Sequence, residues 1–234
     1  MLSIIIPVLN ESENITALLT HLVENSRAQH ISEIIVVDGG STDTTCQLTT
    51  NFAENTTLSV QLFSSERGRA KQMNLGAKQA KGDILYFLHA DSYPPKDFDS
   101  LIISEVQKDN LAGCFRMKFK STHWWLRLAG WFTKFNWRAC RGGDQSQFII
   151  KDLFNEIGGY DETYTIYEDN ILISELYERK QFVVIQHWLY SSARRYEHHS
   201  ILKLQYHFLT IYVKKFFGAS ADDLYAYYQK YIQK

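Results

Sequence analysis

Short apolar runs alternate with helical patterns along the first part of the chain. Residues 3–8, 33–37 and 85–88 are largely bulky and apolar, the pattern of strands that are covered on both faces in a parallel sheet. Residues 60–63 indicate a further strand. Between the first two strands, apolar residues recur at helical spacing at Ile15, Leu18, Leu19 and Leu22. This alternation of strands and helices with short loops predicts right-handed βαβ units and a parallel sheet.

The run at residues 85–88 ends at the most informative point of the sequence. Pro94 and Pro95 follow it closely, and because consecutive prolines cannot extend a ladder, the strand must stop before them. His89 and Asp91 then lie at the carboxyl edge of the sheet, where open α/β sheets bind ligands. A lone aspartate suits a metal ion whose other ligands are water and phosphate oxygens. An Asx-turn before the prolines is the alternative.

Two other polar loops are expected at the same edge. Asn10 and Glu11 follow the first strand, and residues 38–43 follow the second. Asp38 can accept hydrogen bonds from a sugar hydroxyl or a base N–H, and Gly39 lets the backbone approach a ligand closely. The glycines form neither a P-loop nor a GxGxxG motif. We therefore expect three loops to meet in one crevice, without phosphate binding by a glycine-rich turn.

Positive charge gathers where the next helix is expected to begin. Arg67, Arg69 and Lys71 lie at this start, where the helix dipole already favours anions. A diphosphate is the natural ligand of such a site. A solvated basic helix end is the alternative.

The second half of the chain continues the mixed pattern. Strands are indicated at residues 111–120, 141–150, 182–185 and 188–190, and glycines at 158–159 end a short helix. The chain is long enough for one domain with a smaller C-terminal appendage.

Two adjacent carboxylates, Glu168 and Asp169, open a further helix. Acidic residues in the first turn of a helix are commonly caps that the helix dipole favours. At the edge of an active site, one of them can instead act as a general base.

Two aromatic segments have several interpretations. Residues 123–132 are apolar with basic residues between, which suits a helix on a membrane surface, a lid over an acceptor site or a core helix. Residues 201–217 form an amphipathic aromatic helix that packs on the domain, forms a homodimer or contacts a bilayer. The sequence does not decide among these.

Composition narrows the class of protein. The 234 residues are 45% apolar and 22% charged with a net charge of −1, which gives no support for nucleic-acid binding. The three cysteines, Cys46, Cys114 and Cys140, match neither a disulfide framework nor a zinc site, so a reducing cytoplasm is expected. The start of the chain does not have the pattern of a signal peptide, and no apolar run has the length of a membrane span.

The order of these motifs resembles inverting family-2 glycosyltransferases of the GT-A fold. The matching stretches are residues 3–11, 36–43, 89–91, 158–161 and 168–169. Residues 68–74, 142–145 and 192–196 are further similar to a small bacterial branch described as radical-SAM/selenodomain-associated transferases. Each motif alone is weak or moderate, but five in the right order are a strong signal.

The resemblance implies a GT-A, Rossmann-like mixed sheet flanked by helices over residues 1–199, with a helical C-terminal extension at 200–234. Residues 1–95 would hold a nucleotide sugar, UDP- or GDP-linked, and residues 96–199 an acceptor, which is often lipid-linked in the family. With such acceptors, the aromatic segment at residues 124–137 and the C-terminal helix predict weak peripheral association with the inner face of the plasma membrane. The expected donor-binding set is Pro7, Glu11, Asp38, Gly39, Arg67, Arg69, Gln72, Asn74, His89, Ala90 and Arg195.

The same resemblance assigns the chemistry. Asp91 would bind Mg²⁺ or Mn²⁺ against the diphosphate, and Asp169, paired with Glu168, would deprotonate the acceptor hydroxyl. Arg195 would steady the departing diphosphate. The chain departs from the family at His89, which stands where the first Asp of the DxD motif usually lies, so the metal site has lost a carboxylate.

Two other functions fit parts of the sequence. A nucleotidylyltransferase also uses an α/β sheet, a metal ion and a nucleotide, but it would favour a glycine-rich basic loop after the first strand, where this chain has acidic residues 10–13. A non-catalytic nucleotide-sugar binding protein is the second alternative, because His89 can be read as an eroded site.

Overall fold

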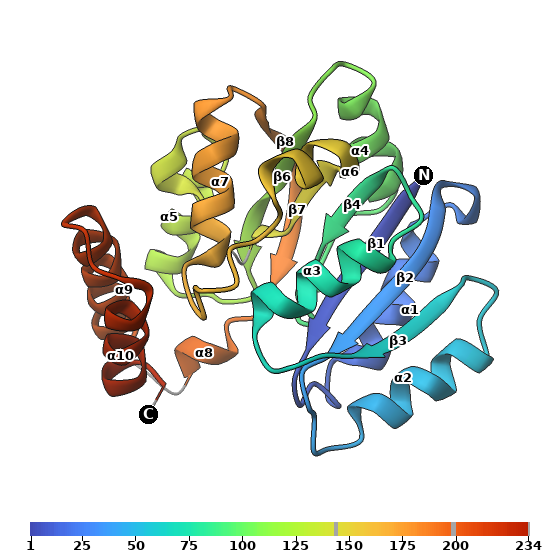
Figure 1. Ribbon diagram of the computed structural model, residues 1–234, viewed down its shortest axis with the longest axis horizontal. Helices are drawn as coiled ribbons and strands as arrows, with labels where there is room; N and C mark the ends of the chain where they lie inside the picture. Colours follow the sequence, from blue (N-terminus) through green and yellow to red (C-terminus); the bar gives the residue numbers. More distant parts are fainter. Residues whose placement is uncertain (143–144, 198–199, 234) are drawn as a thin grey trace.

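The computed structural model describes residues 1–142, 145–197 and 200–233, and it describes Arg195 and Glu197 without their side chains (Figure 1). The strands are β1 (Leu2–Val8), β2 (Ile31–Asp38), β3 (Val60–Ser64), β4 (Ile84–Phe87), β5 (Ser92–Tyr93), β6 (Ala112–Phe119), β7 (Gln147–Ile150) and β8 (Phe182–Ser191). The helices are α1 (Ile15–Asn25), α2 (Thr45–Glu54), α3 (Arg69–Gln79), α4 (Phe98–Val106), α5 (Trp124–Phe132), α6 (Lys151–Ile157), α7 (Glu168–Glu178), α8 (Arg194–Glu197), α9 (Ile201–Phe216) and α10 (Ala221–Tyr231).

The strands form one mixed sheet with the order β3-β2-β1-β4-β7-β6-β8-β5. The first four strands in this order are parallel, as the βαβ pattern predicts. β7 then runs antiparallel to both β4 and β6, and β8 is parallel to β6. β4 therefore lies in the middle of the sheet, and all of its residues are buried. The predicted central strand is confirmed.

Helices cover both faces of this sheet, because alternate strand residues point to opposite sides. On one face, Ile4, Ile6 and Tyr86 pack with residues of α1, α4 and α5. On the other, Ile5 and Phe87 pack with residues of α3, α6 and α7. Figure 1 shows α3 and α7 in front of the sheet and α1 behind it. The predicted mixed sheet flanked by helices is confirmed.

Two strand predictions are wrong in their boundaries. Of residues 141–150, only Gln147–Ile150 are described as a strand, β7. Residues 182–185 and 188–190, expected as two strands, belong to the single strand β8. Its register against β6 shifts after Ile185, so that Trp188 pairs with Arg116 and two residues are bulged out of the ladder. The polar Gln186 and His187 at this bulge interrupt the apolar pattern without ending the strand.

The C-terminal extension is a pair of helices that share a small core, against which Tyr164, Ile166, Tyr167 and Tyr196 also pack. α9 and α10 pack through Leu204, Ile211, Leu224 and Ile232. Ser220 and Asp223 form a capping box at the start of α10. Among the described residues, no helix has the length and apolar character needed to cross a bilayer.

Candidate active site

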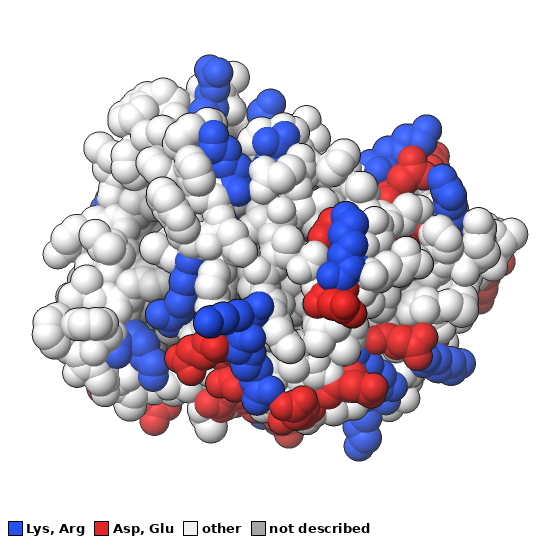
Figure 2. All heavy atoms as spheres, turned by 90° about the horizontal axis from the view of Figure 1, so that it is seen from above, with Lys and Arg blue, Asp and Glu red and all other residues white. Residues whose placement is uncertain are grey.

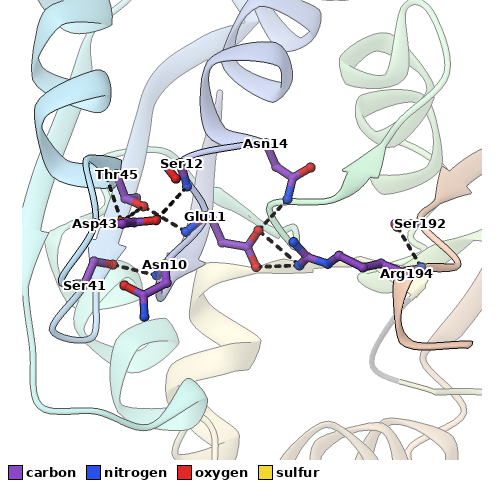
Figure 3. Close-up of polar contacts among 9 residues, drawn as sticks. All are labelled: Asn10, Glu11, Ser12, Asn14, Ser41, Asp43, Thr45, Ser192 and Arg194. Carbon is purple, nitrogen blue, oxygen red and sulfur yellow. Dashed lines mark hydrogen bonds and ion pairs between the residues drawn. The ribbon is translucent and has the colours of Figure 1, made fainter. Parts of the chain in front are cut away.

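The loops after β1 and β2 are joined to each other at the carboxyl edge of the sheet (Figure 3). The backbone N–H of Asn10 donates to Ser41 Oγ at 2.8 Å, and Asn10 Oδ1 accepts from the backbone N–H of Thr42 at 2.8 Å. The backbone N–H of Glu11 donates to Thr45 Oγ1 at 2.8 Å. These bonds confirm that the first two predicted loops meet at one edge.

Asp43 strengthens the same junction. Its carboxylate accepts from the backbone N–H of Ser12 at 3.2 Å and from the hydroxyl and backbone N–H of Thr45 (Figure 3). The hydroxyl of Thr45 has the largest effect, and together these bonds lower the pKa of Asp43 to about 2. Hydrogen bonds that stabilise the charged form have this effect on a carboxylate.

Asp38 shapes the loop in which it lies. Its carboxylate accepts from the backbone N–H groups of Gly40 at 2.9 Å and Ser41 at 3.0 Å, and the residue is almost fully buried. Gly40 has a φ of 95°, which favours glycine. The turn therefore holds the Asp38 carboxylate at the end of β2.

Gln72 on α3 is hydrogen-bonded to the ends of β1 and β2. Its Nε2 donates to the carbonyls of Val8 at 2.8 Å and Val37 at 2.7 Å. A Cβ at Gly39 would come within 3.0 Å of the Gln72 amide. Gly39 is thus needed for close packing on Gln72, whereas the contact of both residues with a donor stays a prediction.

The third loop, after β4, carries His89, Ala90 and Asp91. Ala90 is buried, and His89 and Asp91 are half-buried. The backbone carbonyl of Asp91 accepts from the N–H of Ser192 at 3.2 Å. Next to it, β5 pairs with the end of β8. The C-terminal segment is therefore fixed directly against the Asp91 loop.

Arg194 reaches from α8 into the crevice. Its Nη2 lies 3.1 Å from Glu11 Oε1, while Glu11 also accepts from Asn14 Nδ2 at 2.6 Å (Figure 3). Burial opposes the charge of Arg194, but the carboxylates of Glu11 and Asp91 outweigh it and raise the pKa of Arg194. The family resemblance implied that Arg195 steadies the departing diphosphate, and the side chain of Arg195 lies outside the described atoms.

A small cavity opens beside these loops. Its wall combines the apolar side chains of β1, β4 and α3 with polar groups from four segments. The lining residues are Pro7, Met73, Phe87, Leu88, His89, Gly142, Ser146, Gln147, Tyr160, Asp169 and Ile173. Pro7, His89 and Asp169, which are far apart in the sequence, are thus brought to one place.

The two carboxylates at the start of α7, Glu168 and Asp169, differ in burial and in their contacts. Glu168 is fully buried, and its Oε1 accepts from Arg69 Nε at 2.5 Å. Burial raises the pKa of Glu168, the Arg69 charge opposes this rise and the Asp169 charge adds to it. Asp169 retains 7% exposure, lines the cavity and lies 3.4 Å from Arg69 Nη2. Asp169 is therefore the member of the pair that can meet a ligand.

Two polar groups in the cavity wall were missed by the sequence analysis as site residues. Tyr160 Oη and Gln147 Nε2 are buried and have no hydrogen-bond partner among the described residues. Burial, with the charges of Asp169 and Glu168, raises the pKa of Tyr160 well above its usual value. Buried donors without partners are costly, so both are suited to bind a ligand in the cavity. A glutamine in the otherwise apolar strand β7 was the available signal.

Three of the six described residues other than glycine that have a positive φ lie around the same edge. Asn10 has a φ of 55°, Ser146 of 59° and Tyr167 of 74°. Such conformations are uncommon for residues other than glycine and cluster at functional sites. Tyr167 directly precedes the carboxylate pair, so its conformation sets how α7 begins.

The other predicted donor contacts are less direct. Arg67 is exposed before α3, and Lys71 forms an ion pair with Glu66. Asn74 Nδ2 donates to the carbonyl of Tyr160 at 2.9 Å and to Glu162 Oε1 at 2.8 Å. Two of the three cations at the start of α3, Arg69 and Lys71, are therefore paired with carboxylates. The expected roles of these residues toward a donor stay predictions.

A divalent ion at this site would be held by the carboxylate of Asp91. No group of three His, Cys, Asp or Glu side chains that could hold a metal ion occurs in the part of the chain that is described. The sequence also suggests His198 or His199 as a further ligand, but both lie outside the described residues, as do Gly143 and Asp144 of the 142–145 motif. Asp91 alone fits an ion that takes its other ligands from a diphosphate and water.

Comparison with known proteins agrees with this arrangement. The family model described as glycosyl transferase family 2 matches residues 3–160. Poly(ribitol-phosphate) beta-N-acetylglucosaminyltransferase TarS of Staphylococcus aureus is 34% identical over 96 residues, which are 41% of this chain and 17% of TarS. Undecaprenyl-phosphate 4-deoxy-4-formamido-L-arabinose transferase of Proteus mirabilis is 26% identical over 132 residues, 54% of this chain and 40% of that protein. The chain spans less than half the length of these relatives.

Solved structures share the fold. TarS 1-349 in complex with UDP-GlcNAc has a TM-score of 0.66 at 20% identity, covering 91% of this chain and 65% of that one. Mannosyltransferase PcManGT from Pyrobaculum calidifontis, in complex with GDP-Man and Mn²⁺, has a TM-score of 0.64 at 19% identity, covering all of this chain and 64% of that one. The predicted GT-A fold is confirmed.

Proposed function

The chain belongs to glycosyl transferase family 2, and we propose that it is an inverting transferase that moves a sugar from a nucleotide-diphosphate sugar to an acceptor hydroxyl. The observation that carries the proposal is the position of Asp169. This carboxylate lines a cavity with Pro7 and His89, next to the loops that hold Glu11 and Asp91. The proposed base therefore lies beside the edge that we propose binds the donor.

The donor is a UDP- or GDP-linked sugar. TarS was solved with UDP-GlcNAc and PcManGT with GDP-Man, and both share the sheet whose edge bears the loops described above. We propose that Asp38, at the end of β2, accepts hydrogen bonds from the ribose or the base. Tyr160 and Gln147 offer polar groups to the sugar in the adjoining cavity.

The acceptor is a hydroxyl that approaches Asp169 from the side of α7. The relative from Proteus mirabilis is named for an undecaprenyl-phosphate substrate, so we include lipid-linked acceptors. The narrower likeness to the radical-SAM/selenodomain-associated branch stays a prediction.

Inverting transfer needs one displacement at the anomeric carbon. As the acceptor oxygen attacks, Asp169 takes its proton and the bond to the diphosphate breaks. Arg69 lies 3.4 Å from Asp169 and anchors the buried Glu168, so it holds the base in place. Arg194, beside Glu11 and in the field of Asp91, supplies positive charge near the leaving diphosphate.

Mg²⁺ or Mn²⁺ held by Asp91 would act as a Lewis acid that neutralises the diphosphate. His89 replaces a carboxylate of the usual motif and lines the cavity, where it can donate a hydrogen bond to the donor. The site therefore relies on one protein carboxylate and on Arg194 for charge balance.

Incubation with UDP- and GDP-sugars and Mn²⁺ tests the proposed function. We expect a nucleoside diphosphate to be released from one of them in the presence of an acceptor. A thermal-shift panel of UDP and GDP first identifies the nucleotide, because a ligand that binds the folded state raises Tm. Formation of pyrophosphate from a nucleoside triphosphate and a sugar phosphate would instead identify a nucleotidylyltransferase.

Asp91→Ala is expected to weaken nucleoside diphosphate binding by about 10-fold or more when Mn²⁺ is present, and little when it is absent, because the carboxylate acts through the ion. Calorimetric titration with and without Mn²⁺ measures both affinities. Asp97→Ala removes a half-buried carboxylate beyond the two prolines, which pairs with Arg27 at 3.6 Å, and serves as the control. Equal affinity of the unmutated protein with and without Mn²⁺ would show that the site works without metal.

A further inference from the structure

We propose that α5, residues 133–138 and α9 form one basic aromatic face that docks on a lipid surface with anionic headgroups. The inference rests on the proposed function in one respect: docking on lipid would bring a lipid-linked acceptor to the site. The binding itself follows from the exposed side chains and charges of this face.

α9 exposes an apolar stripe along one side. Leu202, Tyr206, Leu209 and Phe216 are spaced along one helix face and are 67%, 64%, 63% and 85% exposed. The opposite side of α9, including Leu204, packs in the core with α10. The helix thus buries one apolar face and leaves a second one in solvent, which soluble monomers rarely do over such a length.

α5 and the turn after it repeat this pattern. Trp124, Trp131 and Trp137 are 63%, 46% and 57% exposed. Leu126 and Gly130, on the other side of α5, are buried against the domain. Exposed tryptophans suit the boundary between lipid and water, because the indole ring is apolar with one polar edge.

Charge favours anionic lipid over other partners. Residues 124–138 contain three Lys and Arg and no Asp or Glu, and residues 200–221 contain three Lys and again no acidic residue. Figure 2 shows the left end of the molecule, where Figure 1 places α5 and α9, as mostly white with some blue, while acidic side chains lie mainly along the lower edge and toward the right. A second copy would bring the same cations against each other, whereas an anionic bilayer complements them.

α7 joins the two segments into one surface. Tyr212 Oη on α9 donates to Asn170 Oδ1 at 3.2 Å, and Arg138 Nε donates to Ser174 Oγ at 3.0 Å. Asn170 and Ser174 are one turn apart on α7, so both segments lie along the same helix face. Arg138 and Lys215 also both act on the hydroxyl of Tyr167, whose pKa burial raises and these two charges lower.

The basic aromatic face ends beside the proposed base. Tyr167, whose ring lies 5.2 Å from that of Tyr212, directly precedes Glu168 and Asp169. A bilayer on this face would therefore present headgroups near the acceptor side of the cavity. The first residues of α7 therefore connect the docking surface to the cavity that Asp169 lines.

Co-sedimentation of the full chain with vesicles tests the proposal without donor or activity. We expect binding to vesicles that contain phosphatidylglycerol to exceed binding to pure phosphatidylcholine vesicles by at least about 10-fold, and to fall with salt. Equal binding to both vesicles, or binding to neither, would overturn the proposal. Because no turnover is measured, failure of the proposed transferase activity would not affect the result.

Two variants locate the surface. Arg127→Glu/Lys203→Glu reverses an exposed charge in each segment, and Phe216→Ser/Phe217→Ser removes rings that are 85% and 80% exposed, so both should fold. Each is expected to reduce vesicle binding about 10-fold or more, with unchanged Tm. Lys78→Glu/Lys81→Glu, an equal reversal on the distant side, should bind as the unmutated chain does. A homodimer that Phe216→Ser/Phe217→Ser dissociates, without vesicle binding, would assign the face to a second copy instead.

Discussion

Asp169→Asn is expected to lower kcat by about 10²- to 10⁴-fold, the range for loss of a general base, while donor affinity changes by no more than about twofold. Asparagine keeps the size of the side chain and its place in the cavity wall, but it cannot take the proton of the acceptor hydroxyl. The donor is expected to bind mainly to the loops after β1, β2 and β4. We therefore expect kcat to fall while donor affinity stays nearly unchanged.

Single-turnover kinetics and calorimetric titration of the nucleoside diphosphate measure the two effects of Asp169→Asn. Asp152→Asn is the matched control, because Asp152 occupies the corresponding second position of α6 but is exposed. Its kcat should equal that of the unmutated enzyme. Loss of donor affinity in Asp169→Asn together with kcat would show that Asp169 binds the donor and is not the base.

Arg69→Leu is expected to lower the free energy of unfolding by about 3–5 kcal/mol, because it leaves the Glu168 carboxylate buried without its countercharge. Glu168 has no exposed side-chain surface, and its Oε2 has no partner among the described residues. Burial already raises the pKa of Glu168 despite the Arg69 charge, and loss of that charge should raise it further. Activity should fall as well, since Asp169 loses a neighbouring cation.

Urea unfolding measures the effect of Arg69→Leu, and pH gives it a second signature. A carboxyl whose pKa is raised by folding contributes stability below its unfolded value of about 4.5 and loses it as pH rises. The deficit of Arg69→Leu should therefore shrink in acid, and Glu168→Gln in the same chain should restore much of it. A deficit that Glu168→Gln leaves unchanged would show that it does not arise from the buried charge.

Arg179→Leu provides the comparison for Arg69→Leu. Arg179 pairs with Glu156 and Glu175 at the surface, where the partner side chains are 63% and 41% exposed. Exposed ion pairs contribute about 0–1 kcal/mol, so this variant should unfold close to the unmutated protein. The difference in the free energy of unfolding between the two variants measures how much the burial of Glu168 adds to the cost of losing an arginine.

The sequence predicted those parts of the site that local rules determine. The prolines after β4 stop the strand, and the polar loops after β1 and β2 follow apolar runs, so their convergence with Asp91 could be expected from topology alone. The family resemblance added the role of Asp169. Each of these predictions depends on residues that are near one another in the chain or on the regular order of a parallel sheet.

The contacts that the sequence did not reveal join distant segments. Arg69 and Glu168 are 99 residues apart, and Arg194 and Glu11 are 183 apart. Adjacent arginines at 194 and 195 look alike in a sequence, and only the path of the chain after β8 directs Arg194 to Glu11. The bulge in β8 was likewise hidden, because it depends on pairing with β6.

The packing of Gly39 on Gln72 limits which sequences this fold can accept. A Cβ at position 39 would meet an amide that is fixed by two backbone carbonyls, so a larger residue there requires a smaller one at position 72. A smaller residue at position 72 would leave the carbonyls of Val8 and Val37 without that donor. The two positions are therefore expected to vary together or not at all across related chains, although 33 residues separate them.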